Sequence, residues 1–285
     1  AYSACPSPDG SKILFEYDFV GYVNFDGTNV IGNKNSIEQA ADSFDCDGAW
    51  KTDSSAFTSM HGTNNSNKVV CINFGCGKFG TNNLNNQTRL NPHFEPKNNT
   101  LVWPWYQGAG AKVFGTPPDL GPPYFPGFSI GGQVNDYEFS PDGNYFAYLS
   151  QGTIYLRTLG EQSSGYPYWF DPVEKLSGGY SRIAWSANNQ TLLAGYQGNI
   201  YTINITDENP LRTKINSSNT SNNCRIGYFN EAGDKLTYHC NLGGGTTAIY
   251  INNINGTDEK EIARSDNSDD TRPTNLEFPI WIKVN

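Results

Sequence analysis

The feature of this sequence that most limits its fold is a turn motif that returns at a nearly constant interval. The clearest copy, residues 139–143, reads Phe-Ser-Pro-Asp-Gly and precedes strand-like runs at 145–149 and 154–156. Proline pre-sets the backbone angle of a tight turn, aspartate hydrogen-bonds its own backbone, and glycine takes the positive φ. Copies of varying quality begin at Pro6, Trp50, Phe94, Phe139, Trp185 and Phe229. The intervals between them are 44, 44, 45, 46 and 44 residues.

A period of about 40–45 residues with several short strands per unit is the signature of a β-propeller. A β-sandwich, the alternative, would show turn signals every 8–12 residues or so without the longer period. We therefore predict an all-β fold, a single domain over residues 1–285 built from six blades of four antiparallel strands. Residues 278–283 resemble the strand that precedes the motif elsewhere. We expect this C-terminal strand to complete the N-terminal blade, because a closed ring leaves no open sheet edge.

The motif also carries a family resemblance. Residues 7–10 and 140–143 both read Ser-Pro-Asp-Gly, and an aromatic-aliphatic strand and a Gly-x-Ile-Tyr strand follow the second copy. This combination resembles the WD40-like (PD40) repeat of TolB-type propellers over nearly the whole chain. The resemblance implies an architecture and little else, since similar propellers serve as protein-docking modules, peptidase lids and scaffolds of polysaccharide lyases.

Charge and sequence patterns bound the partners and the compartment. The formal net charge is −9, and no Lys/Arg cluster of the kind that neutralises phosphates is present, which argues against nucleic acid. No apolar run approaches the length that crosses a bilayer. The Asn-X-Ser/Thr glycosylation pattern occurs at Asn64, Asn86, Asn98, Asn189, Asn204, Asn216, Asn219 and Asn255. Together with six cysteines, these sequons predict a secreted, extracellular glycoprotein; the alternative is a cytosolic protein with free thiols.

The cysteine positions suggest three disulfides. Cys224 and Cys240 flank the turn at 231–234 almost symmetrically, so a hairpin would place them opposite each other. Cys71 and Cys76 would close a small loop, and Cys5 and Cys46 would then pair by elimination. Sequence alone leaves other pairings open.

Two aromatic, proline-rich segments, 101–134 and 166–172, depart from the repeat. We predict that they are loops on one face of the propeller, where binding sites usually lie. Flat rings with few charges nearby stack on apolar sugar faces and on prolines. The candidate ligand-binding residues are Trp103, Trp105, Tyr106, Tyr124, Tyr168 and Trp169. The alternative is that these aromatics fold over blade edges as local core.

Patterns that carry catalysis are scarce. The chain has three histidines at inequivalent repeat positions, His61, His93 and His239, and lacks His-Glu-x-x-His and Gly-x-Ser-x-Gly. Several acids are interpreted as turn or rim residues: Asp136, Glu138, Asp171 and Glu174. The motif acids Asp9 and Asp142 are predicted to cap tight turns. No cofactor is expected, although the run Asp266, Asp269 and Asp270 offers oxygen ligands for a structural calcium.

Two functions from different classes fit these observations. The first is a non-enzymatic extracellular binding or structural module that recognises glycan or protein through loop aromatics, with self-assembly as a further option. The second is a carbohydrate-active enzyme, a polysaccharide lyase or glycoside hydrolase, with its site at the central channel. The small number of histidines favours the first. The sequence does not identify the ligand.

Overall fold

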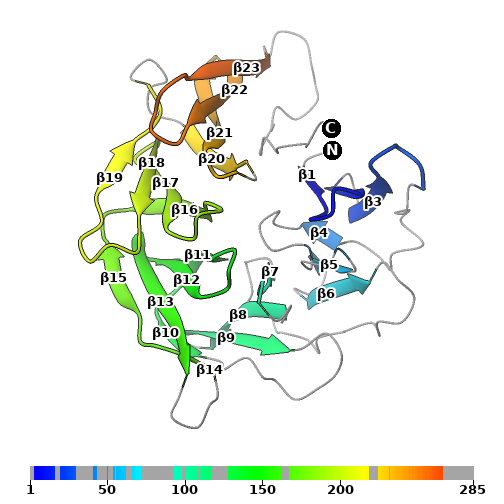
Figure 1. Ribbon diagram of the computed structural model, residues 1–285. Helices are drawn as coiled ribbons and strands as arrows, with labels where there is room; N and C mark the ends of the chain where they lie inside the picture. Colours follow the sequence, from blue (N-terminus) through cyan, green and yellow to red (C-terminus); the bar gives the residue numbers. More distant parts are fainter. Residues whose placement is uncertain are drawn as a thin grey trace. The chain divides into compact units, whose positions relative to one another are not determined.

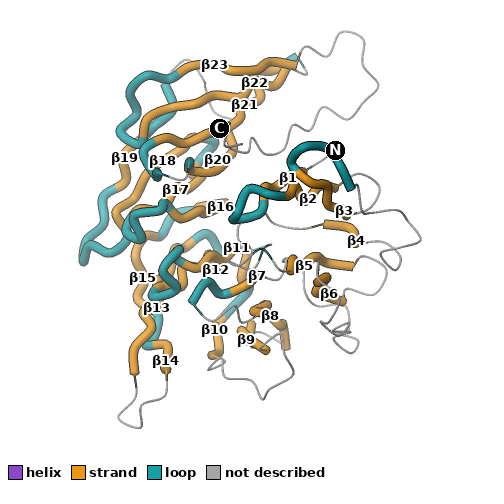
Figure 2. Tube along the Cα trace, turned by 45° about the vertical axis from the view of Figure 1, so that its right-hand side comes forward, coloured by secondary structure: helices purple, strands orange, loops and turns teal. Residues whose placement is uncertain are grey.

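The computed structural model describes residues 3–16, 20–29, 41–43, 50, 54, 56–61, 66–71, 93–97, 101–107, 110–116, 128–161, 167–217, 224–230, 232–244 and 246–265. The regular structure in this part of the chain is all β-strand, without a helix (Figure 2). The described strands form six antiparallel sheets that follow one another along the sequence (Figure 1). The predicted all-β class is therefore confirmed.

Contacts within the chain divide it into two compact units. Unit 1 comprises Ala1–Val134, Leu159–Phe170 and Lys283–Asn285, and unit 2 comprises Asn135–Thr158 and Asp171–Ile282. The single domain over residues 1–285 stays a prediction.

The first three sheets belong to unit 1, and strands that follow each other in sequence are neighbours in the sheet. Two sheets have three described strands: β1 (Ser3–Pro6), β2 (Lys12–Glu16) and β3 (Val20–Asn24), then β4 (Ala41–Ser43), β5 (Ala56–His61) and β6 (Ser66–Cys71). The third has four: β7 (His93–Phe94), β8 (Leu101–Gln107), β9 (Gly110–Thr116) and β10 (Phe128–Gly131). The proposed closing strand, 278–283, lies outside the described residues.

The next sheet has five strands: β11 (Val134–Phe139), β12 (Tyr145–Ser150), β13 (Thr153–Glu161), β14 (Pro167–Trp169) and β15 (Val173–Leu176). Both β14 and β15 pair with β13, at its end and its beginning respectively. Two four-stranded sheets follow: β16 (Tyr180–Trp185), β17 (Thr191–Tyr196), β18 (Asn199–Asn204) and β19 (Arg212–Lys214), then β20 (Cys224–Phe229), β21 (Lys235–Gly243), β22 (Thr246–Asn253) and β23 (Lys260–Ser265). Four-stranded antiparallel sheets, as predicted, therefore recur along the chain.

Four copies of the turn motif, each between the first two strands of a sheet, share one set of backbone hydrogen bonds. In the clearest copy the Ser140 N–H donates to Tyr145 O at 3.0 Å, and the Gly143 N–H donates to Ser140 O at 2.8 Å. The same bonds recur around Ser7, Ser186 and Asn230. The last residue of the motif is left-handed in five copies, with φ of 69° at Gly10, 59° at Ser54, 68° at Gly143, 57° at Asn189 and 70° at Gly233. The repeat seen in the sequence is thus a repeat in three dimensions.

Turns that lie one repeat apart are bonded to each other. In unit 1 the Asp9 N–H donates to Ser54 Oγ at 3.0 Å. In unit 2 the Asp142 N–H donates to Asn189 Oδ1 at 2.8 Å, and the Ser186 hydroxyl donates to Gly233 O at 3.4 Å. These bonds join neighbouring sheets at their motif turns.

Two apolar layers lie on the two faces of the β16–β19 sheet in unit 2. Leu192 packs with residues of β12 and β13, and Leu193 packs with residues of the β20–β22 strands; both are 0% exposed. Because successive side chains of a strand point to opposite faces, adjacent leucines of β17 serve different layers. Truncating either to alanine costs about 2–5 kcal/mol by analogy with other buried leucines.

Candidate functional site

The first predicted aromatic loop is a strand. Trp103, Trp105 and Tyr106 lie in β8, which pairs with β9 along its whole length. The loop prediction rested partly on Pro104, which lacks a backbone donor. The described pairing of β8 with β7 ends at Val102, and among the described residues the strand partner of Pro104 is Val113 of β9. The loop prediction for these residues is wrong; their ligand-binding role stays a prediction.

The second predicted cluster contributes to the core. Tyr168 and Trp169 lie in β14, paired with the end of β13. The Trp169 side chain is 2% exposed, and its ring centroid lies 6.1 Å from that of Phe128. A ring buried to this degree has no face for a ligand, so the assignment of Trp169 to a binding surface is wrong. Tyr124 lies outside the described residues.

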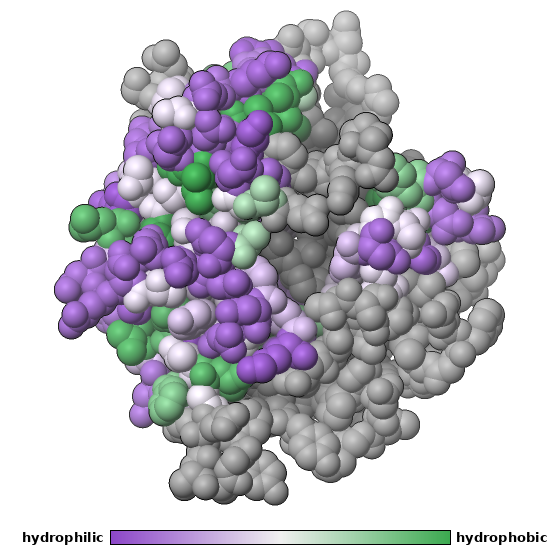
Figure 3. Space-filling model, in the orientation of Figure 1, coloured by the Kyte–Doolittle hydropathy of each residue, from purple (hydrophilic) through white to green (hydrophobic). Residues whose placement is uncertain are grey.

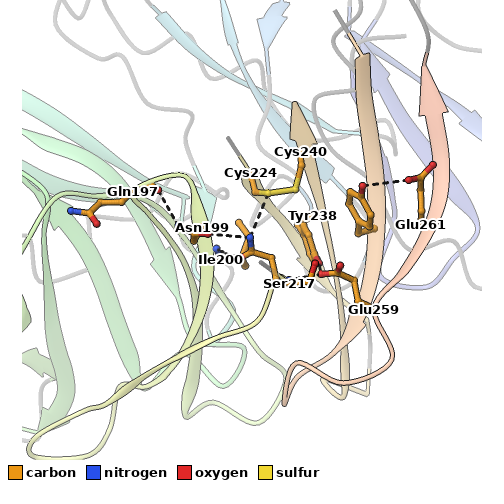
Figure 4. The surroundings of a disulfide bond; sticks show 11 residues. Gln197, Asn199, Ile200, Ser217, Cys224, Tyr238, Cys240, Glu259 and Glu261 are labelled. Atoms are coloured by element: carbon orange, nitrogen blue, oxygen red, sulfur yellow. Dashed lines mark hydrogen bonds between the residues drawn. A yellow bond between two sulfur atoms is a disulfide. The ribbon is translucent and has the colours of Figure 1, made fainter. Parts of the chain in front are cut away.

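The predicted Cys224–Cys240 disulfide is confirmed (Figure 4). The two residues are paired in the register of β20 and β21, with Cα atoms 3.9 Å apart. The Cys224 N–H donates to Gly198 O of the neighbouring sheet rather than across to β21, which suits a non-hydrogen-bonded pair whose side chains approach closely. Cys46 and Cys76 lie outside the described residues, so the pairs Cys5–Cys46 and Cys71–Cys76 remain predictions.

Glu259 anchors the sheet that carries this disulfide (Figure 4). Its Oε2 accepts hydrogen bonds from the Tyr238 hydroxyl and, at 2.8 Å, from the Ser217 N–H. Burial, followed by the hydrogen bond to Glu259, raises the pKa of Tyr238 above its ordinary value. The Tyr238 hydroxyl therefore stays protonated and donates.

Of the four acids that the sequence suggested as turn or rim residues, two are buried and two are exposed. Asp136 is 8% exposed, and its Oδ2 accepts the Ile183 N–H of the next sheet at 2.8 Å. Glu138 is also buried in β11, whereas Asp171 and Glu174 are exposed.

The motif acids cap turns, as predicted. Asp142 Oδ1 accepts the Ser140 hydroxyl at 2.6 Å, and Asp9 accepts that of Ser7 at 2.6 Å. The hydrogen bond from Ser7 lowers the pKa of Asp9 well below its ordinary value.

His239 is a buried histidine close to two arginines. It lies in β21, 8% exposed and in register with Arg225 of β20. Burial first, and then the positive charges of Arg225 and Arg182, lower its pKa to about 4. The imidazole is therefore neutral at physiological pH.

A surface of three tyrosines and one arginine stands out on the β16–β19 sheet. We call Tyr180, Tyr196, Tyr201 and Arg212 the Tyr–Arg surface. The Arg212 Cζ lies 4.1 Å from the ring centroid of Tyr196 and 5.3 Å from that of Tyr201. Its Nη1 donates to the Tyr180 hydroxyl at 3.4 Å. One guanidinium thus contacts a side chain from each of the other three strands of its sheet.

Strand register explains how these four residues meet. Tyr180 pairs with Tyr196, and their ring centroids lie 5.0 Å apart. Tyr196 and Tyr201 are diagonal neighbours in edge contact, with centroids 5.9 Å apart and planes at 74°. The direct partners of Tyr201 are Ala194 on β17, which is small, and Lys214 on β19. The Tyr201 ring therefore has no aromatic partner directly opposite and packs toward Tyr196 and Arg212.

The exposure of the surface grows toward the sheet edge. Tyr180 is 4% exposed, Tyr196 and Tyr201 are half-buried, and Arg212 is exposed on the edge strand β19. Leu211, next to Arg212, is 83% exposed. On the face drawn in Figure 3 most of the described surface is hydrophilic, with small hydrophobic patches between.

The Tyr–Arg surface combines a cation, hydrogen-bonding groups and apolar rings. Hydrogen bonds to Tyr180 and then Tyr196 raise the pKa of Arg212, so the guanidinium is a permanent cation. Guanidinium and tyrosine hydroxyls offer donors in fixed directions, and the rings offer apolar area. The sequence reasoning missed this site because its residues are ordinary members of three strands. The sequence signal that was present is Ala194, where the neighbouring repeats have Tyr148 and Tyr238.

The predictions about metal sites and membrane spans are tested for the described residues only. Within the described ranges, no group of three or more His, Cys, Asp or Glu could hold a metal ion. Asp266, Asp269 and Asp270 lie outside those ranges, so the calcium option stays a prediction. The described residues contain no helix that is long and apolar enough to span a membrane.

Comparison with known proteins supports the fold. No protein-family model matches the chain, and no curated protein matches it. A functionally unknown protein from Desulfotomaculum acetoxidans aligns with a TM-score of 0.62 and 13% identity, covering 92% of this chain and 84% of that one. The Swd1 β-propeller domain of Myceliophteria thermophila aligns with a TM-score of 0.58 and 9% identity, covering 94% and 86%. TolB from Acinetobacter baumannii aligns with a TM-score of 0.51 and 14% identity, covering 89% and 60%.

Identities this low speak to the fold alone. Four-stranded antiparallel sheets in repeated order, together with these likenesses, show that the chain has a β-propeller fold.

Proposed function

We propose that this chain is a secreted, N-glycosylated binding module that contacts a protein partner through its Tyr–Arg surface. The observation that carries the proposal is the exposed Arg212 guanidinium held against two tyrosine rings. Tyrosine and arginine are the residue types enriched among side chains that dominate binding energy at protein interfaces. Leu211, the residue before Arg212 in the chain, is 83% exposed and adds apolar area that a partner would bury. A glycan ligand, which would use the same rings and donors, is the other outcome of the test.

Two observations support the extracellular setting. The Cys224–Cys240 disulfide is of the kind that persists in oxidising compartments. The sequon residues Asn204 and Asn255 are exposed at turns. An enzymatic role at a central channel remains the alternative hypothesis.

The finer architecture belongs to the same proposal. We infer six blades of the TolB type in one domain, closed by residues 278–283 beside the N-terminal hairpin. The support is the interval of 44 to 46 residues and the six described sheets in matching order. Cross-linking cysteines placed at Ile280 and in β1 should form a disulfide in the oxidised protein; a free thiol at both positions would contradict closure.

The binding proposal is tested with the purified protein against a glycan array and in a pull-down from extracellular fluid. Arg212→Ala and Tyr201→Ala should each lower specific binding at least about tenfold, as expected for the loss of an interface anchor. Arg264→Ala is the matched control, because Arg264 is another exposed arginine on an outer strand, paired with Glu261. Equal binding by all three variants would place the site elsewhere. Absence of any specific signal would remove the binding function.

A further inference from the structure

The described sequon residues differ sharply in their surroundings. Asn204 and Asn255 are exposed, Asn189 is partly exposed, and Asn216 is 3% exposed. The sequence pattern treats all of them alike, since it reads only three consecutive residues. The glycan is attached to the amide nitrogen Nδ2 of the asparagine, so the space around that atom decides whether a glycan and the fold are compatible.

Asn204 and Asn255 occupy turns that follow the third strand of neighbouring sheets. Asn204 Oδ1 accepts the Thr206 hydroxyl at 3.1 Å, and Asn255 Oδ1 accepts that of Thr257 at 2.7 Å. Each of these side-chain contacts uses the oxygen, which a glycan on Nδ2 leaves in place. Both side chains reach solvent, so a bulky sugar meets no packed neighbour there.

Asn216 has the opposite environment. Its Oδ1 accepts the Ile200 N–H at 2.9 Å, and its Nδ2 donates to Asn199 Oδ1 at 3.2 Å. The same Nδ2 lies 3.7 Å from Cys224 Sγ, inside the disulfide's surroundings. A sugar on Nδ2 would have to occupy space that Asn199 and Cys224 already fill.

The following residue is fixed as well. The Ser217 N–H donates to Glu259 Oε2 at 2.8 Å, which ties the segment after β19 to the sheet β20–β23. The Asn216 side chain therefore cannot move outward without breaking contacts to β18 and to the next sheet. Leaving the Ile200 N–H or Glu259 without its buried partner would be unfavourable.

We infer that Asn204 and Asn255 carry N-linked glycans in the secreted protein, whereas Asn216 stays unmodified. The inference rests on the secretory route of the proposed function and assigns its modification sites. Glycosylation of Asn216 and the native packing around the Cys224–Cys240 disulfide exclude each other. Chains modified at Asn216 therefore fail to form this packing and are absent from the folded, secreted population.

The test maps glycans on the full chain secreted from a eukaryotic host. Enzymatic glycan release in H₂¹⁸O converts each occupied asparagine to labelled aspartate, which peptide mass spectrometry reads. We expect the label at Asn204 and Asn255 in most molecules and at Asn216 in almost none. Substantial labelling at Asn216, or none at Asn204 and Asn255, would overturn the inference.

Variants separate occupancy from folding. Ser218→Ala erases the Asn216 sequon but keeps the Asn216 side chain, so the glycan mass should stay unchanged and the secreted yield should not fall. Asn204→Gln and Asn255→Gln are the matched comparisons, and each should lose the mass of one glycan. Loss of one glycan in Ser218→Ala would contradict the inference.

Failure of this inference is distinguishable from failure of the proposed function. Labelling at Asn216 in protein that still binds through the Tyr–Arg surface overturns the glycan assignment alone. Glycans at Asn204 and Asn255 in protein that binds nothing overturn the binding function alone.

Discussion

Neighbouring sheets of unit 2 hold the same backbone position in two different ways. In the sheet β16–β19 the first residue of the inner strand is Tyr180, and its ring packs on that of Tyr196 at 5.0 Å. In the sheet β20–β23 the equivalent pair is Cys224 and Cys240, joined by a disulfide. Both first residues dock alike, since the Tyr180 N–H donates to Gly152 O and the Cys224 N–H to Gly198 O.

The difference continues toward the outer strands. Beside the disulfide, Tyr238 and Tyr250 are stacked with ring centroids 5.5 Å apart, and both are buried. In the other sheet Ala194 replaces the first of these tyrosines, and Tyr201 contacts Arg212 instead. The comparison teaches that the β20–β23 sheet is locked at this position by a disulfide, while the β16–β19 sheet is held there by packed rings and carries the exposed Arg212 on two of its tyrosines.

Removing the Cys224–Cys240 disulfide should have the largest effect on stability. The double variant Cys224→Ala and Cys240→Ala should lose about 3 kcal/mol of unfolding free energy, because the bridge spans 16 residues and restricts the unfolded chain. Guanidinium denaturation of the oxidised proteins measures this difference. An unchanged midpoint would show that the disulfide does not stabilise the protein.

The next largest effect on stability is expected at Gly152, whose carbonyl oxygen accepts the Tyr180 N–H of the β16–β19 sheet. A Cβ at Gly152 would lie 2.6 Å from Gly179 Cα, and the φ of Gly152 is +75°. Gly152→Ala should therefore cost about 2–3 kcal/mol of unfolding free energy. Gly10→Ala is the matched control, since its φ is +69° but a Cβ there meets nothing within 4 Å. It should cost only about 1 kcal/mol, and equal costs would exclude the steric explanation.

Acid should weaken the locked sheet through His239. Its folded pKa is about 4, below the ordinary 6.5, so between these values the unfolded chain binds more protons than the folded one. Unfolding free energy should thus fall as pH falls from about 6.5 to about 4, by something like 2 kcal/mol from this group. Across this pH range the denaturation midpoint should change less with pH in His239→Gln than in the wild type. A slope identical to that of the wild type would contradict the assignment.

Removing the cation should have the smallest effect on stability and the clearest effect on binding. Arg212→Ala should lose only about 0.5–1 kcal/mol of unfolding free energy, as is usual for exposed cation–π contacts. Arg212→Lys keeps the charge but lacks the planar fork, so it should recover part of the stability and little of the binding. Thermal melts and binding assays on the same samples separate the two. Full binding by the lysine variant would show that charge alone suffices.

The parts of the fold that the sequence revealed depend on local chemistry. The turn motif predicted its own hydrogen bonds because proline, aspartate and glycine act within a few residues of each other. The Cys224–Cys240 pair followed from its symmetry about one turn. In both cases the relevant partners lie in a single hairpin.

The parts that the sequence did not reveal depend on register between more distant strands. Arg212 meets Tyr180 only because four strands align, and nothing local to Arg212 indicates this. Trp169 was assigned to a surface because a Pro-rich aromatic segment suggests a loop, yet the pairing of β14 with β13 buries it. Asn216 matches a surface motif, but the strand β18 and the disulfide enclose it.

The bonds between turns one repeat apart have a consequence for synthesis of the chain. The hydrogen bond from the Asp9 amide needs Ser54, which lies 45 positions further on. The bond from the Asp142 amide needs Asn189, which lies 47 positions further on. At about 5–20 residues per second, each turn emerges from the ribosome several seconds before the residue that completes it. Maturation of the sheets that carry these two bonds therefore lags their own translation by one repeat, and a ribosomal pause in that interval would hold such a sheet in its incomplete form.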